Sequence, residues 1–307
     1  MATILVTTPT GHIGARVVDQ LLADGTHTVR ILARDPARLA PQVRERADVR
    51  VGALDEGSAL ADALTGIDTF FLLIPPPAPD VPDFHAWQYG VGERAARAVA
   101  DAGTSRTVLL SSSGAHRDDL GPVSTLGEVE RRLAEVAPNL TVVRPGYFFE
   151  NTLNAVGTIA AQGAIYGPYD PDLAFPQIAT RDIGDAVARR LGDAEWRGQS
   201  TTALHGPRDL SMRELAAQAA EALGRPVQYV QVPVEAVSAA MREFGAGPSF
   251  VAEYATMMSG FAASRFEHPE PRTAATTTPT AFASWAREVL ARAVAGAGAA
   301  APATAAA

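Results

Sequence analysis

The first 150 residues alternate short apolar runs with stretches that carry apolar residues at helical spacing. Short apolar runs bounded by turn residues are typical of strands buried on both faces. Ile13, Val17 and Leu21 recur every four residues after the first run, as expected for one face of a helix. Six strands are expected, at residues 3–7, 29–32, 48–51, 68–74, 107–110 and 140–143. The alternation predicts βαβ units, and therefore an α/β fold with a doubly wound parallel sheet of the Rossmann type.

Beyond residue 150 this alternation ends, and glycine and proline punctuate the chain up to about residue 176. Ser211 and Glu214 have the capping-box spacing that opens a helix. Helices are expected at residues 84–102, 125–136, 180–191, 211–223, 244–266 and 278–294, and one further strand at 227–230. The second half is therefore expected to be a smaller, mixed region.

These patterns divide the chain into two parts and a tail. We expect a dinucleotide-binding Rossmann domain over residues 1–150, to which residues 176–205 return. Residues 151–175 and 206–295 are expected to form a substrate-side α/β cap. Residues 296–307 are rich in alanine and lack an apolar stripe, which predicts a disordered tail.

The composition narrows the possible chemistry. The 307-residue chain has no cysteine, and all 26 basic residues are arginine, so thiolate and lysine chemistry are excluded. A net charge of −8 argues against nucleic acid as a partner, since that function needs a basic surface. The histidines lack the spacing of metal ligands, so no metal is expected.

The apolar run Phe70–Ile74 is far shorter than the ~20 residues that a membrane-spanning helix needs. The first residues carry no basic segment, unlike a signal peptide. We therefore expect a soluble, cytoplasmic protein, monomeric or homodimeric, that acts on a small molecule and has no membrane partner.

The turn after the first expected strand, TTPTGHIG, lies where a helix N-terminus meets a dinucleotide pyrophosphate in Rossmann folds. Gly11 and Gly14 match the second and third glycines of the fingerprint, whereas Thr8 stands at the first. Thr8 leaves two alternatives open: a shifted turn, or a hydroxyl that replaces part of the phosphate contact. A plain tight turn is the alternative to nucleotide binding.

Arg34 follows the second expected strand, where an acidic residue would bind the adenosine ribose of NAD. A guanidinium there suits a 2′-phosphate, and Arg38 follows one helical turn later. This favours NADPH/NADP⁺ over NADH as cofactor, against the alternative of a solvated arginine.

Several segments in order along residues 3–290 resemble the NmrA-like atypical short-chain dehydrogenase/reductase family. They are TILVTTPTGHIG, VRILARDP, VGALDEGSALADALTGIDTFFLL, VVRPGYFFEN, IATRDIGDAVARRL and LHGPRDLSMRELAAQAAEALGRPV. The family has an NAD(P)-binding Rossmann fold and includes quinone, phenylcoumaran-type and isoflavone-type reductases, as well as dinucleotide-sensing regulators.

The resemblance implies a set of cofactor-binding residues. It places the pyrophosphate at Thr10, Gly11, His12 and Ile13, the 2′-phosphate at Arg34 and the adenine at Leu54. It places one ribose beside Ile74 and Pro75, and the nicotinamide ribose beside Ser111 and Ser112. The nicotinamide itself would be flanked by Pro145, Gly146 and Tyr147. Ala53 departs from the Asp that is frequent there, so one adenine contact is in doubt.

A second departure concerns the mechanism. Short-chain dehydrogenases use Tyr-x-x-x-Lys, in which lysine lowers the tyrosine pKa for proton donation. The corresponding segment here, GPVSTLGEVE at residues 121–130, has neither residue. Without this relay, two routes to reduction stay open: hydride transfer that needs only positioning, as with a quinone, or proton donation by another side chain. Three glutamates of the same region, Glu128, Glu130 and Glu135, are expected to form a solvated helix face.

Two candidates for a catalytic proton donor are His116, in the turn after the fifth strand, and Tyr147. Residues that could contact the substrate are His85, Tyr89, Phe148, Asn151 and Tyr166. Each of them has a plain structural alternative, an exposed loop or core packing, and the sequence does not choose between them.

The favoured hypothesis is an NADPH-dependent oxidoreductase for an apolar, aromatic carbonyl or quinone-like molecule, without the Tyr-x-x-x-Lys relay. One alternative is a non-catalytic NADP(H)-sensing regulator. Another is a non-redox enzyme, a cyclase or isomerase, on a Rossmann shell. Methionine and aromatic residues between 241 and 261 fit an apolar substrate pocket or ordinary core packing.

Overall fold

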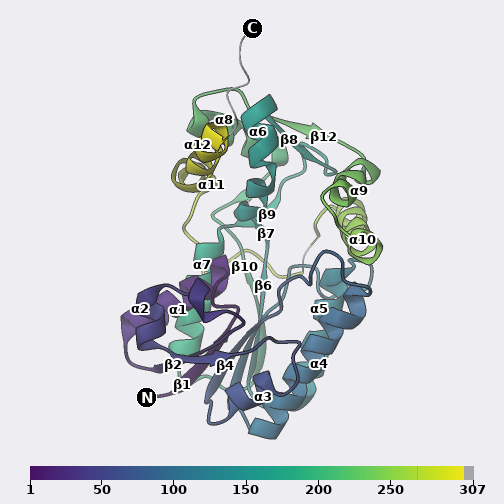
Figure 1. Ribbon diagram of the computed structural model, residues 1–307. Coiled ribbons are helices and arrows are strands. Elements are labelled where there is room, and N and C mark those ends of the chain that lie inside the picture. Colours follow the sequence, from purple (N-terminus) through teal and green to yellow (C-terminus); the bar gives the residue numbers. More distant parts are fainter. Residues whose placement is uncertain (268, 301–307) are drawn as a thin grey trace.

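The computed structural model describes residues 1–267 and 269–300 and has a parallel sheet at its centre (Figure 1). Its seven strands follow the order β10-β6-β5-β4-β1-β2-β3. They are β1 (Thr3–Thr7), β2 (Thr28–Ala33), β3 (Asp48–Val51), β4 (Thr69–Leu73), β5 (Arg106–Leu110), β6 (Leu140–Pro145) and β10 (Gln199–Leu204). The strand order reverses between β1 and β4, which creates the crevice where doubly wound folds bind ligands. The expected fold class is confirmed.

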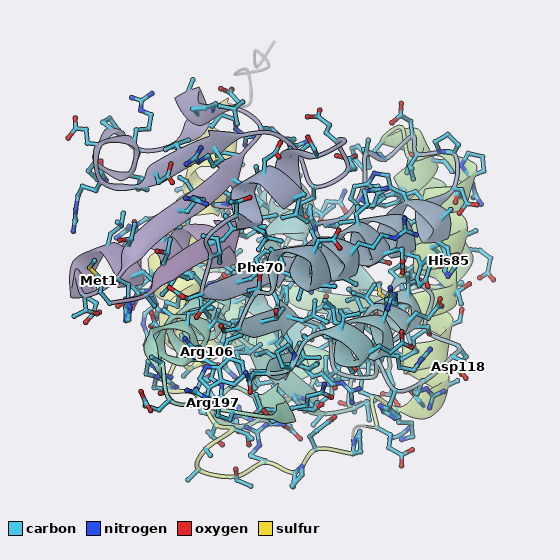
Figure 2. All side chains as sticks on the ribbon, turned by 90° about the horizontal axis from the view of Figure 1, so that it is seen from below. Met1, Phe70, His85, Arg106, Asp118 and Arg197 are labelled. Atoms are coloured by element: carbon cyan, nitrogen blue, oxygen red, sulfur yellow. The ribbon has the colours of Figure 1, made fainter. Side chains whose placement is uncertain are left out.

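Helices cover both faces of this sheet. One face carries α1 (His12–Asp24), α2 (Pro41–Arg46) and α7 (Thr180–Gly192), and the other carries α3 (Ala59–Leu64), α4 (Phe84–Ala102) and α5 (Pro122–Val136). The central strands are apolar on both sides, so Phe70 and Phe71 are both fully buried although they point to opposite faces. Figure 2 shows Phe70 in the middle of the molecule.

The remaining elements form a cap beyond the carboxyl ends of the strands, the edge that we call the carboxyl edge (Figure 1). The cap contains a three-stranded sheet, β11-β9-β7, and a two-stranded sheet, β12-β8. Its strands are β7 (Tyr147–Phe148), β8 (Ala164–Gly167), β9 (Phe175–Ile178), β11 (Asp209–Leu210) and β12 (Gln228–Gln231). Its helices are α6 (Val156–Gln162), α8 (Met212–Leu223), α9 (Val234–Glu243), α10 (Pro248–Ser264), α11 (Phe282–Trp285) and α12 (Ala291–Ala300), with 3-10 segment η2 (Phe149–Ala155) and π-helical segment η3 (Ala286–Leu290). An aromatic and aliphatic core separate from those of the main sheet holds it together.

The chain returns from the cap to the main sheet once, through α7 and β10. β10 pairs in parallel with β6 along its whole length, and α7 packs beside α1. The sequence of β10, QSTTAL, is largely polar because this strand is at the edge of the sheet, with its first residues exposed. That polarity explains why no strand was expected at residues 199–204.

Two helix boundaries in the second half were predicted wrongly. The helix expected at 244–266 is α10 alone and begins only at Pro248, because Gly245 adopts φ +89°; α9, at residues 234–243, was not expected. Residues 278–281 are not helical: the Thr278 N–H donates to the His205 carbonyl, and the helix begins at Phe282.

The end of the chain also differs from expectation. Helix α12 runs to Ala300, so the first residues of the expected tail are helical, and residues 301–307 lie outside the described residues. The expected capping box is present, with Ser211 Oγ accepting from the Glu214 N–H and a Glu214 carboxylate oxygen accepting from the Ser211 N–H. Within the described chain, no helix is long and apolar enough to cross a membrane.

Candidate functional site: a crevice at the carboxyl edge

The turn between β1 and α1 is held in a tight left-handed conformation. Thr8 has φ +54°, one of three described non-glycine residues with positive φ. The Gly11 N–H donates to the Thr8 carbonyl at 3.1 Å. A Cβ on Gly14 would come within 2.1 Å of that same carbonyl oxygen, so only glycine fits there. Thr8 thus keeps the turn of the fingerprint, and its hydroxyl donates to the Thr7 carbonyl at 2.7 Å.

The N-terminus of α1 presents backbone donors at this turn. Its N-cap is Gly11, and no side chain caps the helix. The first N–H groups of a helix have no partner within the helix and, with the helix dipole, attract anions. Thr10, Gly11 and His12 are exposed around these donors, whereas Ile13 is buried in the core and contributes through its backbone. The cradle fits a pyrophosphate.

Arg34 follows the last residue of β2 and is exposed. The Oδ1 atom of its neighbour Asp35 accepts the Ala37 N–H at 2.9 Å, so this carboxylate caps a short 3-10 helix, Pro36–Arg38. Among the described residues neither Arg34 nor Arg38 has an ion pair. A free guanidinium therefore stands where an adenosine 2′-substituent lies in Rossmann folds.

The floor of the crevice lies between β1 and β4. Thr7 Oγ1 donates to the Phe71 carbonyl at 2.9 Å and accepts the Leu73 N–H at 3.1 Å, so it fastens the two strand ends together. Ile74 and Pro75 continue directly from β4, with Ile74 buried and Pro75 half-buried. Leu54 is half-buried after β3.

The ends of β5 and β6 carry a buried group of charged side chains. Arg144 donates to both oxygens of Glu130, Nε to Oε1 at 3.0 Å and Nη2 to Oε2 at 2.5 Å, and Nη1 donates to Glu270 at 2.7 Å. Ser111 Oγ donates to Glu130 Oε1. Glu130 is 8% exposed, so its expected place on a solvated face was wrong, and hydrogen bonding to this carboxylate raises the pKa of Arg144.

Tyr147 stands next to this group, at the entrance to the cap. Its ring makes edge contacts with Tyr169 and Phe175, at centroid distances of 6.4 and 5.7 Å. Burial raises the pKa of Tyr147 to about 12, while a hydrogen bond with Asn151 acts in the opposite direction. The phenol therefore keeps its proton at neutral pH. The structure brings Tyr147 and Asn151 together, as the sequence suggested.

Gly146 separates β6 from β7 for a steric reason. Its N–H donates to the Leu204 carbonyl at 3.0 Å, and a Cβ would lie 2.5 Å from the Pro176 carbonyl oxygen. Pro145, the last residue of β6, accepts the Ser113 N–H at 3.0 Å. Ser112 is half-buried beside Ser111. The chain that follows β5 is thereby fixed against the end of β6.

His116 is exposed in the loop between β5 and α5. This loop is anchored close to α5, because a Cβ on Gly127 would come within 1.9 Å of the Ala115 carbonyl oxygen. Phe261 of α10 covers the same loop and lies 3.2 Å from the position of a Cβ on Gly114. His116 is therefore at the carboxyl edge, near where α10 of the cap meets the sheet domain.

His85 and Tyr89 face α5 together. Their rings stack with centroids 6.1 Å apart, and His85 Nε2 lies 3.1 Å from a carboxylate oxygen of Glu128. In Figure 2, His85 and Asp118 lie on the same side of the molecule, the side that α10 occupies. The pair borders the cap, but no contact joins it to Tyr147 within the described residues.

The other two expected substrate residues are in the cap sheets. Tyr166 is 45% exposed on β8, and its hydroxyl bonds to Gln162 on α6 at 2.7 Å. Phe148 pairs with Ile178 between β7 and β9 and packs against the core of the main sheet. Their roles toward a substrate stay predictions.

A separate cavity of about 650 Å³ opens between the C-terminal ends of α1 and α7. It is lined by residues such as Asp24, His27, Asp185 and Arg189. These helix ends lie beside the amino ends of the strands, because α1 and α7 run antiparallel to the sheet. The cavity is therefore not part of the crevice at the carboxyl edge.

The strand order and the uncapped helix after β1 define a Rossmann fold of the NAD(P)-binding class. The NmrA-like family matches residues 1–266, so the chain belongs to the NmrA-like family. This confirms the resemblance seen in the sequence.

Two characterised relatives are reductases. A (4-alkanoyl-5-oxo-2,5-dihydrofuran-3-yl)methyl phosphate reductase of Streptomyces griseus is 32% identical over 240 residues, covering 78% of this chain and 80% of the relative. An NAD(P)H azoreductase of Xenophilus azovorans is 31% identical over 243 residues, covering 79% and 81%.

Solved structures with low identity share the fold. A structure described as a nucleoside-diphosphate-sugar epimerase of Staphylococcus aureus superposes with a TM-score of 0.79 at 20% identity, covering 94% of this chain and 100% of that one. An NADPH-dependent quinone oxidoreductase of Escherichia coli, in complex with NADPH, has a TM-score of 0.70 at 22% identity, covering 94% and 99%.

The sequence missed the role of three residues, Glu130, Arg144 and Glu270. Glu130 lies in the charged segment GEVERR of α5, which looks the same for a solvated and a buried carboxylate. Glu270 is 126 residues from Arg144 along the chain, so no local pattern could pair them. One signal was present: Arg144 directly follows the apolar strand sequence LTVV, where a charged residue that is not at a surface needs a partner.

Proposed function

We propose that the protein is an NADPH-dependent oxidoreductase that reduces an apolar, aromatic carbonyl or quinone-like molecule. The observation that carries the proposal is the uncapped N-terminus of α1 at the strand-order reversal, with the unpaired Arg34 at the end of the next strand. When bound, the reduced nicotinamide supplies a hydride. The roles of the chain are to bind the dinucleotide, to hold the acceptor and to exclude water.

The preference for NADPH over NADH rests on Arg34 and Asp35. A guanidinium binds a 2′-phosphate through charge-assisted hydrogen bonds. Asp35 is the acid that could accept from a ribose 2′-hydroxyl, but its carboxylate is engaged with the Ala37 N–H. Both residues therefore favour the phosphorylated cofactor.

The acceptor would lie against the cap. Tyr147, Tyr169 and Phe175 form an aromatic group at the start of the cap, next to the end of β6. Arg144, the arginine closest to them in sequence, is fully engaged with two glutamates and offers no charge to an anionic substrate. An apolar aromatic acceptor suits these surroundings. The names of two relatives, an azoreductase and a quinone oxidoreductase, indicate substrates of this kind.

The proton that accompanies the hydride has two candidate sources on the chain. Tyr147 holds its proton because burial raises its pKa to about 12, so its hydroxyl suits hydrogen-bond donation to an acceptor oxygen better than full proton transfer. His116 is exposed at the carboxyl edge, and its imidazole carries an N–H donor. We assign hydrogen-bond donation to Tyr147 and proton delivery to His116.

The test combines binding and turnover. Calorimetry with NADPH and NADH measures affinity, and absorbance of NADPH reports oxidation with a panel of quinones and azo dyes. We expect Arg34→Ser to weaken NADPH about 10- to 100-fold, the scale of one charge-assisted contact, and to leave NADH unchanged. Arg44→Ser, an exposed arginine on α2, is the matched control and should bind both as the parent does. Equal loss for both cofactors would refute the role of Arg34.

A second function is favoured by one observation. The chain lacks the Tyr-x-x-x-Lys relay, as suits a protein that senses NADP(H) without turnover. Tight NADPH binding with no oxidation by any acceptor in the panel would favour this sensor. Measurable turnover that Tyr147→Phe or His116→Asn reduces would favour the oxidoreductase.

A further inference from the structure

The buried charged group at the ends of β5 and β6 has no role in the function proposed so far. It joins Ser111 at the end of β5, Glu130 on α5 and Arg144 at the end of β6, and Glu270 reaches it from the segment after α10. The Glu130 and Arg144 side chains are 10% and 12% exposed. Burying charge is costly unless each group has partners, so this arrangement is strongly determined by the fold.

The hydrogen bonds of this group fix the direction of the Ser111 hydroxyl. Glu130 receives two guanidinium N–H groups from Arg144, so it is a carboxylate that only accepts hydrogen bonds. Ser111 has one hydroxyl proton, and it is donated to Glu130 Oε1. The hydroxyl oxygen then has only lone pairs to offer to anything else.

The Ser111 side chain is on the side of the sheet that carries α5. Side chains alternate along a strand, and Leu109, two residues earlier, packs with Val129 and Leu133 of α5. Ser111 continues that direction just past the end of β5, where the crevice of a doubly wound fold holds the second half of a dinucleotide. The Ser111 oxygen is therefore held at the carboxyl edge, in the part of the fold where that half of the ligand binds.

We propose that Glu130 is a positioning residue that fixes Ser111 as a hydrogen-bond acceptor for the nicotinamide half of the dinucleotide. The proposal rests on the proposed cofactor. The donors it would meet are a ribose hydroxyl or the carboxamide N–H group, the only hydrogen-bond donors of that half. It follows that Ser111 cannot also donate a proton to the substrate, which leaves that step to other groups.

The experiment measures the binding of NADP⁺ by calorimetry, and compares it with the binding of adenosine 2′,5′-bisphosphate. That second ligand carries only the adenosine half and should not reach Ser111. Ser111→Ala and Glu130→Asp are the main variants. The shorter aspartate keeps a negative charge for Arg144 but withdraws from Ser111, so it separates positioning from charge balance.

We expect each variant to weaken NADP⁺ about tenfold, the scale of one hydrogen bond, and to leave adenosine 2′,5′-bisphosphate unchanged. The double variant should bind NADP⁺ no more weakly than Ser111→Ala alone, because Glu130 acts through Ser111. Glu93→Gln is the control. It removes a carboxylate of α4 that pairs with Arg132 of α5, and neither residue bonds to Ser111, Glu130 or Arg144. It should bind both ligands as the parent does.

Three results would overturn the proposal. Glu130→Asp could bind NADP⁺ as tightly as the parent, or the losses of NADP⁺ affinity caused by the two substitutions could multiply in the double variant. The third is an equal loss of affinity for NADP⁺ and for adenosine 2′,5′-bisphosphate. Thermal unfolding of each variant shows whether a loss reflects the fold. Failure of the parent to bind either ligand would instead refute the proposed cofactor, so the two failures are distinguishable.

Discussion

At the β1–α1 turn the crevice is lined by backbone, whereas at the ends of β5 and β6 it is lined by side chains that neutralise one another. The turn depends on Gly14 and on the left-handed Thr8, and its donors are exposed N–H groups. The other end depends on a carboxylate, a guanidinium and a hydroxyl that are almost fully buried. In our proposals, the first end binds a phosphate through backbone donors, and the second end presents one hydrogen-bond acceptor in a fixed direction.

This difference indicates how each end tolerates change. A backbone cradle is sensitive to added atoms, since a single Cβ can close it. A buried charged group is sensitive to removed atoms, since each loss leaves a charge without a partner. The four predictions below test this contrast, from the largest expected effect to the smallest.

Removing the guanidinium of Arg144 should lower the stability of the protein more than any of the other changes. Arg144→Met leaves the buried Glu130 without its cation, which we expect to lower the free energy of unfolding by about 3–5 kcal/mol. Urea unfolding measures it. Arg213→Met breaks an ion pair with Asp172 that is exposed on both sides and should leave stability unchanged. Similar losses in both variants would show that the burial of the group is not what makes it matter.

Adding a methyl group at Gly14 should distort the β1–α1 turn. Gly14→Ala would bring Cβ to 2.1 Å from the Thr8 carbonyl oxygen, so the turn must move, at a cost of about 1–3 kcal/mol. NADPH affinity should fall with it, as measured by calorimetry. In Gly11→Ala the nearest atom is 3.6 Å away, so this variant should fold as the parent does. Normal NADPH binding by Gly14→Ala would contradict the backbone cradle.

Relieving the strain at Thr8 should be mildly stabilising. A β-branched residue at φ +54° is strained, and Thr8→Gly should raise the free energy of unfolding by up to about 1 kcal/mol after the entropy cost of glycine. Thr8→Ala keeps the strained backbone and loses the hydroxyl bond to Thr7, so it should be destabilised. If Thr8→Gly is the less stable of the two, the entropy cost of glycine outweighs the backbone strain, because both variants lose the hydroxyl bond.

The smallest effect concerns the ion pair between Glu93 of α4 and Arg132 of α5, and its dependence on pH. Hydrogen bonding to Arg132 lowers the pKa of Glu93 from its usual 4.5. A lowered pKa in the folded state stabilises the protein above the unfolded value and is lost as pH falls through the folded value. Glu93→Gln should therefore have a slightly lower unfolding midpoint than the parent at about pH 7, and the gap should close towards about pH 3. A gap that is constant with pH would exclude the charge as its cause.

The same contrast explains how much could be predicted from the sequence. The β1–α1 turn, its two glycines and Arg34 are within about thirty residues and follow local rules of strand, turn and helix, so their pattern was visible. The strand at 199–204 was missed because an edge strand has polar residues and no buried alternation. Helix α9 was missed because it has almost no buried side chains, Ser238 being its one buried residue.

The sequence by itself determined the class of fold, the first six strands and the glycine turn after β1, because hydrophobic periodicity and glycine positions are local properties of the chain. Its lack of lysine also excluded the usual proton relay. Only the tertiary structure decided that Glu130 is buried, that it holds Ser111, and that Glu270 completes the group from 126 residues beyond Arg144. Burial and pairing of charges depend on which distant segments meet, and no local pattern records that.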